Sequence, residues 1–391
     1  MPPYRILVVD DSAFMRKFVA DIITEDPSFT VVSTAVNGRE AIEAVRRLRP
    51  DCLTLDVEMP VMSGLETLPI LMKESPLPVI MMSSPTQQGT ELTIKALELG
   101  AFDFVSKPSG QAGFDPAQFR STLQGTLRAA VTSRKPDAAV KLAPPLSLPP
   151  PPKRIEPAPK REKPPPSTLQ PRARLQPDTP LAAGGPEPGK KPPPILSSKL
   201  VAIGTSTGGP RALQTILTQI PGDFPAPILI VQHMPAGFTR SLAQRLNTLC
   251  SIRVTEAEDG MEPTPGTAYI APGGRHMTLT RDSGRSRLRT TSDPPRNGHR
   301  PSVDVLFESL LEFKELERTV VLLTGMGADG AKGMKLLYDS GVTRTFAEDQ
   351  SSCVVYGMPR AAVELGCVNR IIPLDRLANV LTKCVSHSEE V

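Results

Sequence analysis

Tryptophan is absent from this chain of 391 residues, which also holds only four tyrosines and four histidines. No apolar run approaches the roughly 18 residues that a membrane-spanning helix needs, so we expect no direct membrane insertion. The N-terminus lacks the longer apolar stretch of a signal peptide. The five cysteines are scattered and form no C-x-x-C pair, which argues against a disulfide framework or a structural zinc site. This usage of cysteine predicts a reducing, cytoplasmic location.

The chain also has little excess charge of either sign: 45 Lys and Arg are nearly balanced by 41 Asp and Glu, which gives a net charge of +4. So mild an excess predicts no nucleic-acid partner. Proline is abundant, and 20 of the 44 prolines lie in residues 133–198, a segment with a net charge of +7. We predict that this segment is a disordered Pro-rich basic linker between domains at 1–132 and 199–391. The alternative is a docking strip for an acidic partner or a proline-binding groove.

Both flanks of this linker alternate apolar strand patterns with helical patterns, which predicts two α/β domains with parallel sheets. In the first flank we expect a five-stranded parallel, doubly wound sheet. Its strands are Arg5–Asp10, Thr30–Ala35, Cys52–Asp56, Pro78–Ser83 and Asp103–Ser106, and its helices are Ala13–Thr24, Gly38–Leu48, Leu65–Glu74, Gly89–Leu99 and Pro116–Val131. In the second flank we expect strands near Leu200–Thr205, Ile228–Gln232, Ala268–Ala271, Val320–Thr324, Thr343–Ala347 and Arg370–Pro373, with an antiparallel hairpin over Met277–Thr291.

Polar residues follow the expected strands of the first domain. Asp10 and Asp11 follow the first strand, Asp56 ends the third, Ser83 ends the fourth, and Lys107 follows the fifth. Because the carboxyl ends of parallel strands share one edge of a sheet, we expect these side chains to converge. Three crowded carboxylates suit Mg²⁺, a carboxylate can accept a phosphoryl group, and a lysine can neutralise one. The alternative is a set of solvated loop charges.

These residues resemble the receiver domain of two-component response regulators over about the first 125 positions. The motifs that carry the resemblance are Asp10-Asp11, Asp56 with Met59-Pro60 and Ser63-Gly64, Ser83-Ser84 and Lys107-Pro108. The resemblance implies that Asp56 is the phosphoacceptor and that a histidine kinase is the phosphodonor. It further implies Mg²⁺ held by Asp10, Asp11, Asp56 and the Glu58 carbonyl, phosphoryl contacts from Ser83 and Lys107, and a switch role for Phe104. Phe104 lacks the hydroxyl that many relatives carry there.

The second domain opens with Gly204-Thr205-Ser206-Thr207-Gly208, a G-x-S-x-G pattern between an apolar strand and a helix that begins near Arg211. This pattern is typical of a serine nucleophile on a sharp strand-to-helix turn. A phosphate-binding turn, or a turn that is merely tight, is the alternative. The glycines allow close approach of a substrate, and the helix N-terminus offers free N–H groups.

A serine nucleophile needs a base, and His233 follows the next expected strand at the same sheet edge. His276 and His299 are expected on loops, where they could line the substrate cleft, and His387 lies in the C-terminal tail. Asp329 follows the strand that ends near Thr324 and is the candidate orienting carboxylate. Its alternative role is an N-cap for a helix over Gly330–Tyr338. The order serine, histidine, aspartate differs from that of α/β-hydrolases.

Nearly all of residues 199–391 resemble the catalytic domain of the chemotaxis response regulator protein-glutamate methylesterases. The motifs are Ile203–Pro210, Val231–Met234, Tyr269–Gly273, His299–Asp304 and Leu323–Gly327 with Asp329-Gly330. The resemblance implies hydrolysis of glutamate methyl esters on chemoreceptors, deamidation of receptor glutamines as in many members of the family, and adaptation in chemotaxis, with no cofactor for the esterase chemistry. The roles implied are Ser206 as nucleophile, His233 as base and Asp329 as its partner. Backbone N–H groups of Met326, Thr207 and Gly208 are the oxyanion candidates.

The family pattern also implies that the receiver restricts the esterase site until Asp56 is phosphorylated. Because effective concentration falls with tether length, the long linker predicts only modest inhibition. Two other functions compete: a binding adaptor, disfavoured by intact Ser206, His233 and Asp329, and a serine hydrolase with a substrate outside chemotaxis. A DNA-binding output is poorly supported, because the second domain is nearly neutral.

Overall fold

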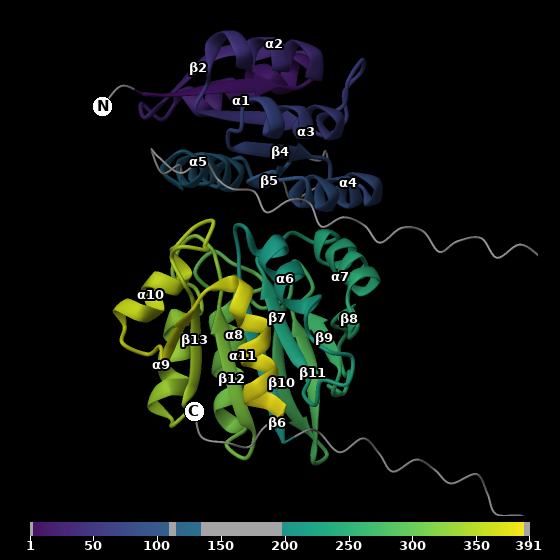
Figure 1. Ribbon diagram of the computed structural model, residues 1–391, viewed down its shortest axis with the longest axis vertical. Coiled ribbons are helices and arrows are strands. Elements are labelled where there is room, and N and C mark those ends of the chain that lie inside the picture. Colours follow the sequence, from purple (N-terminus) through teal and green to yellow (C-terminus); the bar gives the residue numbers. More distant parts are fainter. Residues whose placement is uncertain (1–2, 109–114, 134–197, 387–391) are drawn as a thin grey trace, which may run out of the picture. The chain divides into compact units, whose positions relative to one another are not determined.

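The computed structural model describes residues 3–108, 115–133 and 198–386, so the predicted linker and His387 lie outside the described residues. The segments on either side of the linker belong to one compact unit, in which each domain is built on its own parallel sheet (Figure 1). No helix in the described ranges has the length and apolar character to cross a membrane.

The N-terminal domain is a parallel sheet in the order β2-β1-β3-β4-β5, with helices on both faces (Figure 1). Its strands are β1 (Tyr4–Val9), β2 (Phe29–Ala35), β3 (Cys52–Asp56), β4 (Val79–Ser83) and β5 (Asp103–Ser106). Its helices are α1 (Ala13–Thr24), α2 (Gly38–Leu48), α3 (Gly64–Glu74), α4 (Gln87–Glu98) and α5 (Pro116–Ser133). The predicted five-stranded doubly wound sheet is confirmed, and the chain reverses its winding direction between β1 and β3.

Polar residues at the helix starts explain why the chain turns where it does. The side chains of Ser12, Asn37, Ser63 and Thr86 each accept a hydrogen bond from the backbone three residues on. Ser63 also forms a reciprocal capping box with Glu66. The caps at Ser12, Ser63 and Thr86 fix the loops at the carboxyl ends of β1, β3 and β4, beside the acidic residues and Ser83, whereas the cap at Asn37 follows β2.

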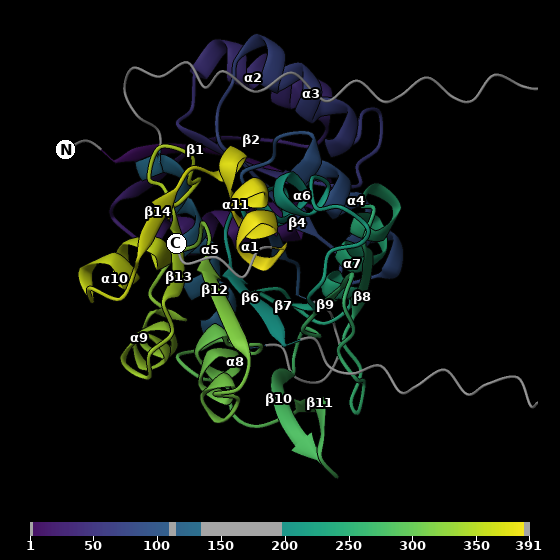
Figure 2. The same ribbon diagram turned by 60° about the horizontal axis from the view of Figure 1, so that its bottom comes forward.

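The C-terminal domain is a seven-stranded parallel sheet in the order β14-β13-β12-β6-β7-β9-β8. Its strands are β6 (Lys199–Thr205), β7 (Ile228–Gln232), β8 (Arg253–Glu256), β9 (Thr267–Ile270), β12 (Glu317–Leu322), β13 (Arg344–Glu348) and β14 (Arg370–Ile372). The predicted hairpin is β10 (His276–Asp282) with β11 (Arg285–Thr291), a separate antiparallel pair (Figure 2). The helices are α6 (Gly209–Leu217), α7 (Phe238–Leu249), α8 (Val303–Ser309), a 3₁₀ turn at Leu310–Glu312, α9 (Ala331–Asp339), α10 (Met358–Glu364) and α11 (Leu374–Ser386).

Three details of this second domain differ from the sequence-based expectation. Strand β8 was not expected, because it is a four-residue edge strand in which only Val254 is buried. The expectation that His276 lies on a loop is wrong, since it begins β10 and is buried. Strand β12 ends at Leu322 rather than Thr324, because the Thr324 N–H donates to the Glu348 carboxylate, 2.8 Å away, instead of to a neighbouring strand.

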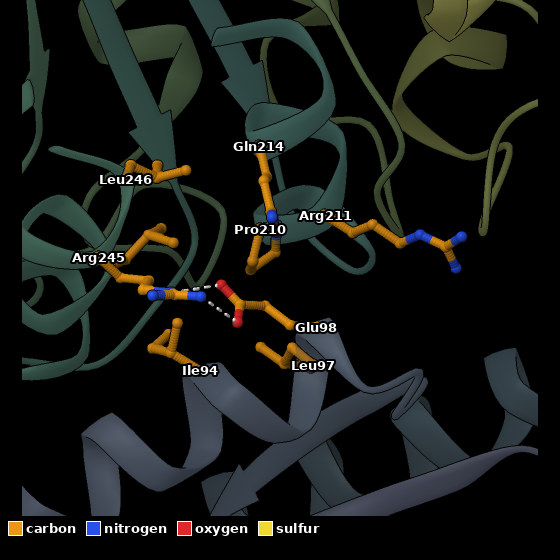
Figure 3. A pocket seen from close by; sticks show the side chains of 9 residues that line it. Ile94, Leu97, Glu98, Pro210, Arg211, Gln214, Arg245 and Leu246 are labelled. Carbon is orange, nitrogen blue, oxygen red and sulfur yellow. Dashed lines mark hydrogen bonds and ion pairs between the residues drawn. The ribbon is translucent and has the colours of Figure 1, made fainter. Parts of the chain in front are cut away.

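The two domains contact each other through α4, which packs on α6 and α7. Arg245 of α7 forms a two-pronged ion pair with Glu98 of α4, with distances of 2.7 and 3.0 Å, at the edge of a pocket that is also lined by Leu97 and Pro210 (Figure 3). Phe104 stacks on Phe238 with ring centroids 4.6 Å apart. The predicted switch residue of the first domain therefore contacts the second domain directly.

Candidate active site and acidic cluster

The carboxylates of the N-terminal domain converge as predicted. Oxygens of Asp10, Asp11 and Asp56 lie within 4.8 Å of one another, at the point where the sheet reverses direction. The Lys107 ammonium lies 2.7 Å from both Asp10 Oδ2 and Asp56 Oδ2. Burial raises the pKa of Asp56 to about 6, although Lys107 acts in the opposite direction. Burial opposes protonation of Lys107, but the two carboxylates raise its pKa above the ordinary value.

This cluster fits a magnesium ion by the chemistry of its donors. Asp10 and Asp56 are buried, whereas Asp11 is exposed, so the cluster is open to solvent on one side. Carboxylate oxygens with room for water are the ligands that Mg²⁺ prefers. The backbone N–H of Glu58 donates to Asp56, which places the predicted Glu58 carbonyl ligand on the same loop.

Among the described residues, no hydrogen bond joins Ser83 or Phe104 to Asp56. The Ser83 hydroxyl donates to the Gly89 carbonyl, 3.2 Å away on α4, and Ser83 is fully buried. Phe104 is also buried and faces Phe238. Their roles in phosphorylation stay predictions, but both side chains contact elements that could transmit a change at Asp56.

Ser206 lies in the turn between β6 and α6, where the predicted nucleophile was expected. Its backbone N–H donates to the Thr324 carbonyl at 3.0 Å, and its own carbonyl accepts from the Gln232 amide at 3.0 Å. The turn requires glycine at two positions. Gly208 has φ of +78°, and a Cβ at Gly209 would lie 1.9 Å from Gln232 Oε1.

His233 and Asp329 form a buried pair. His233 Nε2 lies 2.8 Å from Asp329 Oδ2, and both side chains are almost fully buried. Burial would raise the pKa of Asp329, but His233, the Val303 N–H and the Ser302 hydroxyl together lower it to about 2. The carboxylate is therefore ionised, so it accepts the proton of His233 Nε2 in a hydrogen bond. This arrangement leaves His233 Nδ1 as the basic nitrogen.

The base and the nucleophile follow adjacent, paired strands. Thr205 pairs with Gln232 in the sheet, and the His233 N–H donates to the Thr205 carbonyl at 3.2 Å, so Ser206 and His233 are next to one another at the strand ends. Among the described residues, His233 Nδ1 is buried and has no hydrogen-bond partner. No hydrogen bond joins it to Ser206 in this structure, and such catalytic bonds often tighten only when substrate is bound.

Asp329 is held by the start of α8, not of α9. Its oxygens accept from the Ser302 hydroxyl at 2.8 Å, from the Val303 N–H at 2.6 Å and from the Asp304 N–H at 3.2 Å. The alternative role of Asp329 as N-cap of the following helix is wrong, because Gly330 occupies that position with no side-chain cap. With four donors around it, the carboxylate is fixed in one orientation toward His233.

The oxyanion candidates lie on the two turns that flank Ser206. In the described part of the chain, no acceptor is recorded for the backbone N–H groups of Thr207, Gly208 and Met326. The Thr324 hydroxyl donates to the Thr207 carbonyl at 2.9 Å and accepts from the Val355 N–H at 3.0 Å, which joins the two turns. Free N–H groups on rigid turns can stabilise a developing oxyanion.

Comparison with known proteins identifies both domains. The family model described as CheB methylesterase matches residues 201–381, and the response regulator receiver domain matches residues 6–115. A protein-glutamate methylesterase/protein-glutamine glutaminase of Geobacillus kaustophilus is 46% identical, over 98% of this chain and 99% of that protein. The chain belongs to this family. The protein of the same description from Bacillus subtilis is 42% identical, over 97% of this chain and 98% of that protein.

The solved catalytic domain of the Thermotoga maritima CheB methylesterase is 43% identical, covers 49% of this chain and 100% of that chain, and has a TM-score of 0.47. The two family-model matches assign the first sheet to a receiver domain and the second to a methylesterase domain.

Sequence reasoning expected that His276 and His299 could line the substrate cleft but assigned them no partner, and it missed Glu348. The ring of His299 stacks on that of His233, with centroids 3.9 Å apart. His276 Nδ1 accepts from the Ser302 N–H, 3.2 Å away, beside the Asp329 pair. Glu348 is fully buried and anchors Thr324. Burial raises its pKa above the ordinary value. A carboxylate at the end of a parallel strand was the available signal for Glu348, whereas nothing in sequence spacing places His299 on His233.

Proposed function

We propose that this chain is a phosphorylation-activated hydrolase that removes methyl groups from glutamate methyl esters of chemoreceptors. The observation that carries the proposal is the buried His233–Asp329 pair, 2.8 Å apart, with the free nitrogen of His233 beside the turn of Ser206. A chain in this family with a complete nucleophile, base and carboxylate has the parts of an enzyme. A protein that only binds a partner would have no use for a nucleophile, a base and a carboxylate in one site.

In the first half-reaction, Ser206 Oγ attacks the side-chain carbonyl of the methylated glutamate, and His233 Nδ1 takes the serine proton. The Asp329 carboxylate stabilises the imidazolium and keeps its Nε2 proton in place. Negative charge develops on the former carbonyl oxygen, where N–H groups of Thr207, Gly208 and Met326 would donate. The intermediate collapses, methanol leaves with the proton from His233, and an acyl-Ser206 ester remains.

In the second half-reaction, water attacks the acyl-enzyme while His233 takes its proton. Collapse returns the proton from His233 to Ser206 and releases the glutamate carboxyl group, which loses its own proton to solvent, so the net reaction is ester plus water to carboxylate, methanol and a proton. The same steps deamidate a receptor glutamine, with ammonia as the leaving group in place of methanol. Neither half-reaction needs a cofactor, because the residues named supply the nucleophile, the base and the oxyanion donors.

Control of this site would come from the receiver domain, with residues 1–132 acting on residues 199–391 across the linker at 133–198. A cytoplasmic histidine kinase would supply the phosphoryl group to Asp56. Mg²⁺ held by Asp10, Asp11, Asp56 and the Glu58 carbonyl would neutralise charge on that group, and Lys107 would contact it. The contact of Phe104 with Phe238 supports a route from the phosphorylation site to the methylesterase domain.

The deciding experiment measures methanol release from methylated chemoreceptor membranes, with and without a small phosphodonor. We expect release that rises with the donor. Release that the donor does not change would refute the phosphorylation control but keep the esterase. No release from a folded protein would refute the proposed substrate and favour an adaptor or another ester.

A further inference from the structure

The ring of His299 covers one face of the ring of His233. The two imidazoles are nearly parallel, with an interplanar angle of 7° and centroids 3.9 Å apart. Within the described part of the chain, the His233 ring makes a single hydrogen bond, from Nε2 to Asp329, and that bond alone would allow the ring to pivot. A flat group packed against the ring face removes this freedom.

His299 makes this contact with its ring face alone. Within the described residues, no hydrogen bond to either ring nitrogen of His299 is recorded, and its backbone N–H and carbonyl both bond to Arg296. Burial and the neighbouring His233 lower the pKa of His299 to about 4, although Asp329 opposes this. The ring is therefore neutral at the pH values at which a histidine base works, and it adds no charge beside His233.

A tight turn presents His299 to the site. Arg296 and His299 exchange backbone hydrogen bonds of 3.0 and 2.9 Å, and the two residues between them, Asn297 and Gly298, have φ values of +52° and +81°. Left-handed backbone at both central positions is the geometry of a type I′ turn, for which Asn-Gly is the preferred sequence. The Asn297 amide also reaches Asp304 Oδ2 at 3.4 Å.

Two further contacts fix this turn to the rest of the domain. The Arg296 guanidinium bonds both oxygens of Glu308 on α8, at 2.7 and 2.9 Å. The Arg300 carbonyl accepts from the Gly274 N–H at 3.1 Å. The turn is thus tied to two neighbouring segments, so the position of the His299 ring is set before substrate arrives.

We infer that His299 is a positioning residue, whose ring face holds the His233 ring in the orientation that keeps Nε2 on Asp329 and Nδ1 toward Ser206. The inference rests on the proposed role of His233 as the base, but not on the identity of the substrate. During acylation the His233 ring must take a proton on Nδ1 without rotating. The neutral, stacked ring of His299 meets both needs, because it blocks rotation and brings no repelling charge.

The test uses the full-length chain and a fluorophosphonate, a serine-directed probe that reports nucleophilic attack by Ser206, as phosphonylation, without any receptor. Ser206 Oγ displaces fluoride from phosphorus, and His233 takes the serine proton. The measurement is the second-order rate constant of labelling, followed by intact mass. Three variants are compared with the wild type: His299→Leu removes the flat ring but keeps bulk, His299→Phe keeps a flat ring without nitrogens, and Arg296→Ala loosens the turn but keeps the ring.

We expect His299→Leu to label about 10–100-fold more slowly, as for a misplaced catalytic group. His299→Phe should stay within about threefold of the wild type, and Arg296→Ala should fall between the wild type and His299→Leu, because it loosens one of the two ties that place the ring. Thermal unfolding of each variant checks that the fold is retained, and the rescue by phenylalanine separates a ring contact from a general structural role. A wild-type rate for His299→Leu would overturn the inference.

Two other results would also overturn it. If His299→Phe is as slow as His299→Leu, the ring nitrogens matter, and His299 acts on the substrate side. If Arg296→Ala, which keeps the ring, is slower than His299→Leu, the turn acts through something other than the ring contact. A wild-type chain that does not label at all would remove the Ser206–His233 chemistry on which the inference rests. A chain that labels normally but releases no methanol would keep this inference and refute only the proposed substrate.

Discussion

Replacing Asp329 by asparagine tests the buried pair most directly. Asp329 Oδ2 accepts from His233 Nε2 and the Val303 N–H, and Oδ1 accepts from the Ser302 hydroxyl and the Asp304 N–H. Asparagine has the same shape but carries two donor hydrogens where the carboxylate has an acceptor. In either orientation of the amide, its NH₂ group meets a backbone N–H that it cannot bond.

Two effects of different size follow from this geometry. The unpaired buried N–H costs about 1–3 kcal/mol of folding stability. If the amide NH₂ faces His233, Nε2 must accept, the ring proton moves to Nδ1, and the base is lost. The expected fall in kcat is about 10⁴-fold, the scale measured for this substitution in an unrelated serine enzyme.

The assay is methanol release from methylated receptors, with urea unfolding of the same Asp329→Asn preparation. Ser302→Ala is the matched control, because it removes one hydroxyl donor from Asp329 Oδ1 and leaves Oδ2 untouched. We expect this control to lose about 100-fold or less, for a hydrogen bond to a charged group worth about 1.5–3 kcal/mol, which is far below the loss expected for Asp329→Asn. An Asp329→Asn enzyme that keeps more than a tenth of wild-type kcat would refute the role of Asp329 in fixing the His233 tautomer.

Three further outcomes are expected. Ser206→Ala should lower turnover roughly 10⁴–10⁶-fold in the methanol assay, and a loss under tenfold would exclude Ser206 as the nucleophile. The pKa of Asp56 rises from 3.8 to about 6 on folding, so the folded chain binds this proton more tightly than the unfolded chain does. The free energy of unfolding should therefore fall as the pH rises from 3.8 to about 6. In urea titrations, Asp56→Asn should remove this pH dependence. The variant should be more stable than the wild type by about 3 kcal/mol at pH 7.5 and equally stable below pH 4. Arg245→Ala removes a partly exposed pair with Glu98 worth up to about 1 kcal/mol, so basal methanol release should rise about 2–5-fold without a phosphodonor. Arg240→Ala, an exposed change on the same helix, should leave basal methanol release unchanged. If Arg240→Ala and Arg245→Ala raise basal release equally, the Arg245–Glu98 pair does not restrain the methylesterase.

The sequence predicted the two sheets well because their strands are buried on both faces. Such strands appear as continuous apolar runs, as in β7 (Ile228–Gln232), and the turns between them carry recognisable caps. The predicted ends of the elements differ from the structure by no more than three residues. The short edge strand β8 was missed because its residues alternate between polar and apolar and pair on one side only.

The candidate sites were predictable where residue position follows from the sheet. Asp10, Asp56, Ser206 and His233 all end or follow parallel strands, so topology alone brings them to one edge of each sheet. His299 was placed correctly on a loop, but its stacking partner depends on how the turn after β11 folds back. That is a long-range packing result, and no local periodicity encodes it.

The strand order of the second sheet has a consequence for biosynthesis. Strand β6, fully buried at its apolar positions, pairs with β7 on one side and with β12 on the other. Asp329, which follows β12, is made 123 residues after Ser206, roughly 6–25 s later at ribosomal rates of about 5–20 residues per second. During that interval the nascent chain carries a serine and a histidine without their carboxylate, and β6 has an unpaired edge that can join strands of other chains. Translation of β12 and the turn after it therefore both activates the hydrolase and covers an edge prone to aggregation.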